Sequence, residues 1–227
     1  MKMLSVKLLR MSARTAAVGS AIVSALAFLA GPAPLATAEP CSDVELIFGR
    51  GTSEDPGIGR VGQALADALT PQLGGRTLST YGINYPATYD FLAAADGAYD
   101  ATARINALAA QCPSTKVVLG GYSQGAAIVD MLIGVPPVGD KIGEFGSAPP
   151  LPGSLAGKVA AVAVFGNPGA KFSHPANTAP SPYGGRAIDL CADGDPICSR
   201  GRNPFAHTHY ESSEFIPQAA GFVAALV

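Results

Sequence analysis

Charged residues are scarce in this sequence: Asp, Glu, Lys and Arg make up only 14% of its 227 residues, and no long block of Lys and Arg occurs. The missing basic block argues against a nucleic-acid-binding protein. The sequence also lacks collagen-like triplets, heptads and repeats of about 20 to 50 residues, which excludes fibrous, coiled-coil and solenoid proteins. Because 48% of the residues are hydrophobic, an intrinsically disordered chain is excluded as well.

The amino terminus has the features of a secretory signal peptide. Four basic residues within the first 14 positions precede an apolar stretch at 16–30, and Ala36-Thr37-Ala38 has the small residues of a cleavage site. A membrane anchor is disfavoured because the apolar stretch is shorter than a span of about 20 residues. No Arg-Arg pair indicates twin-arginine export, and no Cys follows the cleavage site to accept a lipid. We therefore predict that residues 1–38 are removed.

The predicted mature chain, residues 39–227, is acidic. It keeps all 17 acidic residues but only 11 of the 15 basic ones, for a net charge of −6. A chain of this size can form one domain with a sizeable core. We expect a secreted, extracellular monomer, either released or retained at the cell wall. Its expected partners are small-molecule or lipid esters, with peripheral contact to lipid or the cell envelope, and not nucleic acids.

All four cysteines lie in the predicted mature chain: Cys41, Cys112, Cys191 and Cys198. An even number of cysteines in an exported protein predicts disulfides. Of the three connectivities, we favour Cys191–Cys198, which closes a short loop, and Cys41–Cys112, which ties the amino terminus to the middle of the chain. The lack of a C-x-x-C pair argues against a zinc site. We expect no metal and no cofactor.

Apolar runs and helix-like spacings alternate along the mature chain. Strands are predicted at 44–48, 81–85, 116–120, 159–165 and 187–190, and helices at 58–69, 91–110, 124–133 and 215–227, the last beginning near Pro217. The stretch 134–153 is rich in Pro and Gly and is predicted to be a loop. Strands that alternate with helices indicate a mainly parallel sheet with helices on both faces, a three-layer α/β/α sandwich.

The segment Gly121-Tyr122-Ser123-Gln124-Gly125 carries the main chemical signal. It lies between a predicted strand and a predicted helix and matches G-x-S-x-G, the nucleophile elbow of α/β-hydrolases. A serine in such a turn is strained, and the flanking glycines let neighbouring backbone approach without a Cβ clash. The helix that follows directs free N–H groups toward a developing oxyanion. We predict that Ser123 is a nucleophile, with an ordinary structural turn as the alternative.

A serine nucleophile needs a base, and the chain has three histidines: His174, His207 and His209. In this fold class the acid falls between the serine and the histidine. His174 is disfavoured because the acidic residues before it lie on the elbow helix or in the Pro/Gly loop. For the other two histidines, the candidate acids are Asp189, Asp193 and Asp195. A disulfide across 191–198 would hold the last two aspartates rigidly, but spacing alone separates neither the aspartates nor the histidines.

Four motifs, in this order, resemble the cutinase family of serine esterases. They are Arg50-Gly51-Thr52-Ser53-Glu54, the Gly-Tyr-Ser-Gln-Gly pentapeptide, C-x-x-x-D-x-x-C at 191–198 and H-x-x-Y at 207–210. Together with Cys41 they cover the mature chain as far as residue 210, and the set is far more specific than any one motif. The resemblance is strongest to actinobacterial, especially mycobacterial, cutinase-like proteins, which have similar leaders and alanine-rich helices.

The resemblance implies a role for each matching residue. It implies Ser123 as nucleophile, His207 as base and Asp195 as the acid that orients it, which leaves Asp193 and His209 as bystanders. It further implies an oxyanion hole made of Thr52, where fungal members have Ser, and the backbone N–H of Gln124. The two implied disulfides are the pairs favoured above. The implied fold is an α/β-hydrolase without a lid, and the motifs are indeed separated by no insertion long enough for a helical lid.

These features predict a secreted serine carboxylic ester hydrolase that cleaves short- to medium-chain acyl esters. One alternative is a lipase, phospholipase or acyltransferase that acts on envelope lipids with the same residues. Another is a non-enzymatic, secreted interaction or antigenic protein that retains only the fold. We expect an open cleft without strong interfacial activation.

Three weaker signals are interpreted conservatively. The G-x-G-x-x-G match at 57–62 does not directly follow a strand, so we interpret it as the entry to a helix and not as a dinucleotide site. His207-Thr208-His209 lacks a third metal ligand. The segment 199–206 joins the acid to the base and is predicted to border the cleft. Within it, Phe205 either contacts the acyl chain or packs as an ordinary side chain.

Overall fold

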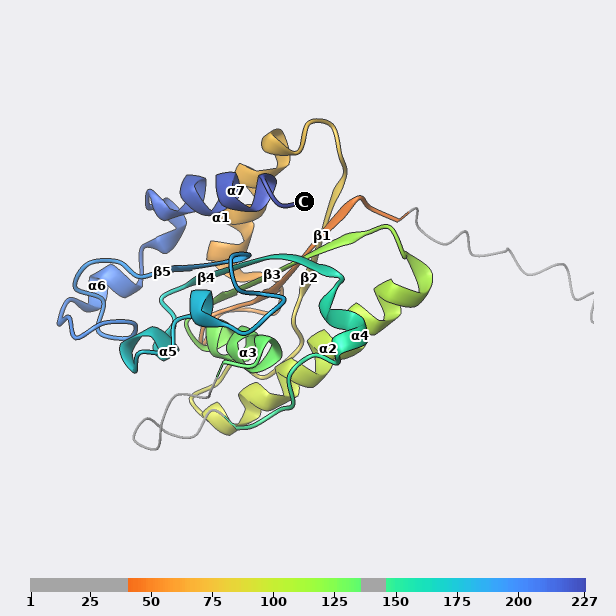
Figure 1. The fold of residues 1–227 in the computed structure, drawn as a ribbon. Helices are drawn as coiled ribbons and strands as arrows, with labels where there is room; N and C mark the ends of the chain where they lie inside the picture. Colours follow the sequence, from red (N-terminus) through yellow and green to blue (C-terminus); the bar gives the residue numbers. More distant parts are fainter. Residues whose placement is uncertain (1–40, 136–145) are drawn as a thin grey trace, which may run out of the picture. The chain divides into compact units, whose positions relative to one another are not determined.

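Five parallel strands form one sheet in the order β2-β1-β3-β4-β5 (Figure 1). The computed structural model describes residues 41–135 and 146–227. The strands are β1 (Val44–Gly49), β2 (Leu78–Gly82), β3 (Lys116–Tyr122), β4 (Val159–Phe165) and β5 (Ala187–Leu190). The longer helices are α1 (Gly59–Leu69), α2 (Ala94–Gln111), α3 (Gln124–Ile133) and α7 (Phe215–Ala224).

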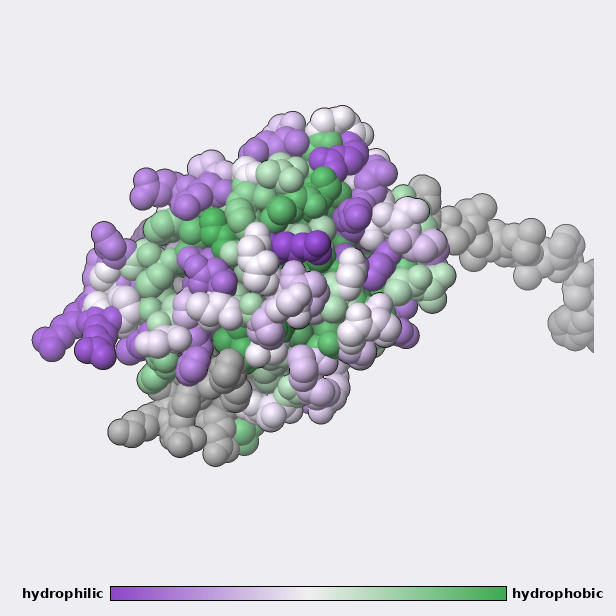
Figure 2. Space-filling view, viewed as in Figure 1, coloured by the Kyte–Doolittle hydropathy of each residue, from purple (hydrophilic) through white to green (hydrophobic). Residues whose placement is uncertain are grey.

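Short helical turns connect these elements. They are α4 (Gly153–Ala156), α5 (Pro168–Lys171) and α6 (Pro204–His207), with 3₁₀ turns η1 (Thr70–Leu73), η2 (Phe91–Ala93), η3 (Ala176–Thr178) and η4 (Tyr210–Ser212). No helix within 41–135 or 146–227 is long and apolar enough to cross a membrane. The face of the described residues seen in Figure 2 mixes hydrophilic and hydrophobic side chains over its whole area.

Helices cover both faces of the sheet, α1 and α7 on one side and α2 and α3 on the other (Figure 1). Alternate strand residues enter the two cores: on β4, Val162 and Val164 pack on the side of α2 and α3, whereas Ala163 and Phe165 pack on the side of α1 and α7. A strand covered on both faces is apolar at every position, and all seven residues of β4 are buried. The predicted three-layer α/β arrangement is confirmed.

Most predicted elements lie within one or two residues of their observed bounds, but the second strand was predicted wrongly. It spans Leu78–Gly82 and not 81–85, because β2 is one of the two edge strands and its half-exposed residues give a weak apolar signal. The buried Ile83 and Tyr85, which suggested the later position, follow the strand. The helix predicted at 91–110 begins with η2, and α7 begins at Phe215 with Pro217 in its first turn. The signal peptide at 1–38 and part of the loop at 134–153 lie outside the described residues.

A buried acid on α3, Asp130, and a half-buried acid on β5, Asp189, share one partner. The Asn167 amide donates to Asp130 Oδ1 (3.2 Å) and to Asp189 Oδ2 (2.7 Å). Asp130 is 2% exposed. Burial, with a smaller contribution from the charge of Asp189, raises the pKa of Asp130 well above its usual value. Burial also raises the pKa of Asp189. Folding therefore takes up protons at this pair.

The first prediction concerns the pH dependence that this pair confers. The folded pKa of Asp130 exceeds its unfolded value of 3.8, so its contribution is most favourable below that pH and is lost as the pH rises toward the folded pKa. We expect Asp130→Asn to become steadily more stable relative to wild type as the pH rises from about 4 to the folded pKa, because the variant has no proton to lose. Urea unfolding at several pH values measures this, and a difference that stays constant with pH would refute it.

Candidate active site

The candidate site lies at the carboxyl edge of the sheet. Loops that follow β1, β3, β4 and β5 carry Thr52, Ser123, Asn167 and Asp195, respectively. In parallel α/β sheets, ligands bind beyond the carboxyl ends of the strands where the strand order reverses. Here the chain passes from β1 outward to β2 and then returns to β3 on the other side of β1. The Thr52 and Ser123 loops therefore flank this reversal.

Ser123 occupies the sharp turn between β3 and α3. Its φ of 55° and ψ of −115° lie outside the regions that non-glycine residues favour. The Ser123 amide donates to the Phe165 carbonyl at 3.0 Å. A Cβ atom on Gly125 would lie 1.9 Å from the carbonyl oxygen of Gly49, and one on Gly121 would lie 2.4 Å from that of Gly125. Both flanking glycines are thus required by close backbone contacts, as the sequence predicts.

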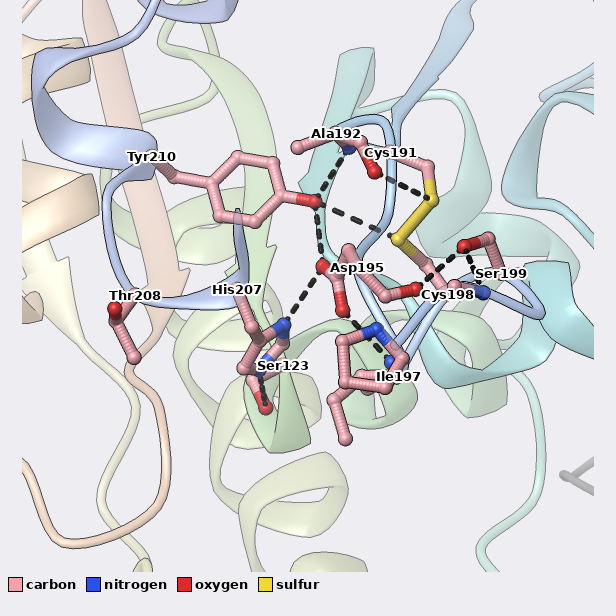
Figure 3. Close-up of polar contacts among 12 residues, drawn as sticks. Ser123, Cys191, Ala192, Asp195, Ile197, Cys198, Ser199, His207, Thr208 and Tyr210 are labelled. Carbon is pink, nitrogen blue, oxygen red and sulfur yellow. Dashed lines mark hydrogen bonds and ion pairs between the residues drawn. A yellow bond between two sulfur atoms is a disulfide. The ribbon is translucent and has the colours of Figure 1, made fainter. Parts of the chain in front are cut away.

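Three side chains from separate segments meet in a hydrogen-bonded series (Figure 3). Ser123 Oγ lies 2.9 Å from Nε2 of His207, and Nδ1 of His207 lies 2.8 Å from Oδ2 of Asp195. The structure therefore brings together the serine, the histidine and the aspartate that the resemblance implies. The His207 ring packs closely against Gly166. A Cβ atom at Gly166 would lie 2.8 Å from Cε1 of His207, so a larger residue there would displace the ring.

Asp195 is fully buried and receives three hydrogen bonds through its carboxylate. Oδ2 accepts from Tyr210 at 2.8 Å in addition to His207, and Oδ1 accepts from the Ile197 amide at 2.7 Å. Burial alone would raise the pKa of Asp195, but the hydrogen bonds from His207, Ile197 and Tyr210 outweigh it and lower the pKa below its usual value. The carboxylate is therefore charged at neutral pH and faces His207.

The Asp195 loop is closed by the Cys191–Cys198 disulfide, and a second disulfide joins Cys41 to Cys112. Both pairings agree with the sequence prediction. The hydroxyl of Tyr210 lies within this loop, where it accepts from the Ala192 amide at 2.8 Å and contacts Cys198 Sγ at 3.5 Å (Figure 3). Tyr210 thus connects the disulfide loop to the carboxylate, which explains the tyrosine of the H-x-x-Y motif.

The second prediction is that one disulfide mainly holds Asp195 in place and the other mainly stabilises the fold. In the chain-entropy model the short Cys191–Cys198 loop contributes roughly 2–3 kcal/mol and the long Cys41–Cys112 loop roughly 4–5 kcal/mol. We expect the double variant Cys191→Ser/Cys198→Ser to lose activity while still folded, because Asp195 is no longer fixed. Cys41→Ser/Cys112→Ser is the matched control and should lower Tm more but kcat less. Tm by circular dichroism and kcat measured well below Tm test this; equal kcat losses would contradict it.

Thr52 and Gln124 lie side by side next to Ser123. Thr52 Oγ1 is 3.1 Å from the amide oxygen Oε1 of Gln124, whose side chain is 1% exposed. The Gln124 Nε2 atom is buried and has no partner among the described residues. As the first residue of α3, Gln124 also has a backbone N–H that no intrahelical bond uses. The Thr52 hydroxyl, which donates to Gln124 Oε1 here, and the Gln124 N–H therefore both lie beside the serine.

A buried arginine fixes the loop that carries Thr52. Arg50 is 4% exposed, and its guanidinium donates to three carbonyls: those of Glu54 (2.9 Å), Ile83 (3.3 Å) and Tyr85 (2.7 Å). The guanidinium also lies 4.9 Å from the centroid of the Tyr85 ring. These contacts hold the loop after β1 against the segment after β2. From the sequence, Arg50 was identified only as part of a motif, without this function.

A pocket of about 450 Å³ opens at Ser123. Apolar lining comes from Tyr89, Phe91, Pro168, Pro196 and Ile197, and polar lining includes Thr52, Glu54, Arg60, Lys171 and Thr208. The 199–206 segment was wrongly predicted to border this cleft, since only its neighbours 196, 197, 207 and 208 line the pocket. Phe205 is 71% exposed on α6 and does not line it.

A sequence match over most of the chain identifies its family. Residues 40–227 match the cutinase family. The chain belongs to the cutinase family. It is 45% identical to phospholipase Culp4 of Mycobacterium tuberculosis over 187 residues, which are 82% of this chain and 80% of that protein. It is 41% identical to carboxylesterase Culp1 of the same organism over 216 residues, covering 91% and 93% of the two chains.

The fold agrees with this assignment. A solved structure of Trichoderma reesei cutinase in complex with a phosphonate inhibitor aligns with a TM-score of 0.63 and 31% identity, covering 82% of this chain and 77% of that one. The resemblance inferred from the four motifs is thus confirmed, as is the cutinase-like α/β-hydrolase fold.

The remaining candidate residues of this cutinase-family chain lie away from Ser123. His174 lies in the loop after α5, and Nδ1 of His209 contacts the Phe205 carbonyl at 2.7 Å. Asp189 is bonded to Asn167, and Asp193 is exposed. No group of three or more His, Cys, Asp or Glu side chains in the described part of the chain could hold a metal ion.

Proposed function

We propose that this protein is a secreted carboxylic ester hydrolase that cleaves short- to medium-chain acyl esters through an acyl-enzyme on Ser123. The observation that carries the proposal is the hydrogen-bonded series from Ser123 Oγ through His207 to the buried Asp195 carboxylate. A serine hydroxyl becomes a nucleophile when a base positioned by a third group takes its proton. The family supports the same reaction class, since the relatives are named carboxylesterase and phospholipase.

In the proposed mechanism, His207 Nε2 takes the Ser123 proton as Oγ attacks the ester carbonyl carbon. The tetrahedral intermediate then collapses, its bond to the alcohol oxygen breaks, and His207 gives that oxygen the proton. Water, deprotonated by His207, attacks the acyl-enzyme carbonyl carbon. The bond from this carbon to Ser123 Oγ then breaks, His207 returns the proton to Oγ, and the acid is released. Asp195 balances the imidazolium at each stage, and its lowered pKa keeps it ionised for this purpose.

The oxyanion is proposed to accept hydrogen bonds from the Thr52 hydroxyl and the Gln124 backbone N–H. In the structure, Thr52 Oγ1 donates to Gln124 Oε1, and Gln124 Nε2 has no partner within 41–135 and 146–227. A half-turn of the amide would let Nε2 donate to Thr52 Oγ1. This turn would satisfy the buried nitrogen and free the Thr52 proton for the oxyanion.

The third prediction tests the oxyanion donor. Thr52→Val keeps the shape of the side chain but removes its hydroxyl, and we expect kcat to fall by about 10²–10³ with little change in KM. Thr52→Ser restores the donor and serves as the matched control, with kcat close to wild type. Initial rates on p-nitrophenyl butyrate measure both variants. Equal rates for the valine and serine variants would show that the hydroxyl is not used.

A panel of p-nitrophenyl esters of graded chain length tests the proposed function. The apolar part of the 450 Å³ pocket, lined by Tyr89, Phe91 and Ile197, supports a preference for short to medium chains. We expect kcat/KM to peak within that range, with no sharp rise above the solubility limit of the ester. No turnover of any ester by folded protein would instead favour a non-enzymatic, binding role.

A second candidate is a phospholipase or acyltransferase on envelope lipids, favoured by the 45% identity to a protein named phospholipase. Release of fatty acid from phospholipid vesicles, compared with acyl transfer to added alcohols, separates these activities from simple hydrolysis.

We further propose that residues 1–38 direct secretion, which the two disulfides support. Mass spectrometry of the culture medium should then find a mature amino terminus at Glu39.

A further inference from the structure

A second, larger hollow adjoins the Ser123 pocket. It has a volume of about 960 Å³ and lies between the loop after β1, the first three turns of α1 and Glu211 on η4. Thr52, Glu54 and Arg60 line both hollows, so the two adjoin beside the proposed oxyanion hole. We refer to the larger hollow as the acidic groove.

The acidic groove carries an excess of negative charge. Four carboxylates line it (Glu54, Asp55, Asp67 and Glu211), against one cation, Arg60. Arg60 is already paired, since its Nη1 lies 2.5 Å from Glu211 Oε1 and its Nε lies 3.3 Å from Glu54 Oε1. Asp55 and Asp67 are exposed and form no ion pair with any described residue. The groove therefore presents uncompensated carboxylates to a ligand.

The groove also offers both hydrogen-bond donors and hydrogen-bond acceptors. Gln63 donates its amide to Asp67 Oδ1 at 2.8 Å, and the second N–H of that amide is available to an acceptor. Ser53 adds a hydroxyl, and the carboxylate oxygens are acceptors. By contrast, the Ser123 pocket is lined on one side by aromatic and apolar residues. The two hollows thus differ in the chemistry that they can bind.

We propose that the acidic groove holds the alcohol half of the ester, while the apolar pocket holds the acyl chain, and that the groove selects uncharged, hydroxyl-rich alcohols over alcohols that carry phosphate. This inference rests on the proposed ester hydrolysis at Ser123. Hydroxyl groups can donate to the carboxylates and accept from Gln63, whereas a phosphate would be repelled by the unpaired carboxylates. Substrates are thus discriminated by the charge of the leaving alcohol.

Two esters with the same acyl group test the selection. For 1-butanoylglycerol we expect a kcat/KM about tenfold or more above that for 1-butanoylglycerol 3-phosphate at about 10 mM salt, where the Debye length is about 30 Å. The ratio should shrink toward unity at about 0.5 M salt because the charges are then screened. Equal kcat/KM values at low salt would overturn the proposal. A higher kcat/KM for butanoylcholine, whose alcohol is cationic, than for 1-butanoylglycerol would also overturn the proposal. The charge of the alcohol, and not its hydroxyl groups, would then determine which ester is preferred.

Charge variants test whether the selection against the phosphorylated ester arises in the acidic groove. Asp55→Asn and Asp67→Asn should each raise the relative kcat/KM of the phosphorylated ester about two- to fivefold at low salt. Asp96→Asn is the matched control: it removes the same charge from an exposed position on α2, on the other face of the sheet. Equal changes in all three variants would mean that net charge, and not the groove, is responsible. Hydrolysis of p-nitrophenyl butyrate by wild type tests the proposed function separately.

Discussion

Replacing Ser123 with alanine is expected to lower kcat on p-nitrophenyl butyrate by more than about 10⁴-fold and up to about 10⁶-fold. The variant loses the oxygen that forms the acyl-enzyme, while the oxyanion donors and the pocket remain. KM should change little in any residual activity, because the groups that contact the bound ester are intact. The measurement is the initial rate at saturating ester with protein free of other hydrolases.

Alanine keeps the Cβ atom and therefore the backbone strain at this position, where Ser123 has a φ of 55°. Folding must be checked by circular dichroism, and Tm should stay close to that of wild type. Ser154→Ala, an exposed serine on α4, is the matched control and should retain full activity. A folded Ser123→Ala protein with more than about one-hundredth of wild-type kcat would remove the serine from the mechanism, given the losses seen for serine nucleophiles.

Replacing Asp195 with asparagine is expected to lower kcat about 10⁴-fold, because an amide no longer fixes the tautomer of His207 or balances its charge. The side chains have nearly the same shape, and Oδ1 still accepts from the Ile197 amide. Asp193→Asn provides the matched control in the same disulfide loop, because Asp193 is exposed and contacts neither histidine in the structure. We expect it to retain nearly all activity.

Asp195→Asn is also expected to change the stability of the fold, and the choice of pH separates this effect from the loss of kcat. The folded pKa of Asp195 is lowered, so the carboxylate contributes stability above its unfolded pKa, and this contribution is lost as the pH falls. The kcat ratio between Asp195→Asn and wild type should therefore be measured near neutral pH at a temperature where both are folded. Equal losses of kcat for Asp193→Asn and Asp195→Asn would leave the acid unassigned.

The sequence predicted the features that depend on local pattern. Apolar runs placed the central strands β1, β3 and β4, which are covered on both faces. The elbow was predictable because its glycines are required by contacts within the turn and with the adjacent strand. The short 191–198 disulfide was predictable from spacing, and the family resemblance then distinguished Asp195 from Asp193 and His207 from His209.

Features that depend on contacts between distant segments could not be predicted in this way. The edge strand β2 is half exposed, so the buried residues after it gave the stronger signal. Arg50 bonds only to backbone carbonyls, which have no sequence signature. The pocket residue Tyr89 lies in the loop before η2 and Phe91 begins η2, and the direction of this segment depends on tertiary packing. The bond from Tyr210 to Asp195 joins two loops 15 residues apart, and only the motif marked that tyrosine.

The central claim is that Ser123 is the nucleophile and that His207 and Asp195 activate it. The most direct test is to treat the protein with a p-nitrophenyl alkylphosphonate and locate the adduct by peptide mass spectrometry. The account predicts one adduct per chain, on Ser123, with release of one equivalent of p-nitrophenol, and strongly slowed labelling of Asp195→Asn. An unlabelled Ser123 in protein that still hydrolyses esters, or an adduct on another residue, would contradict it.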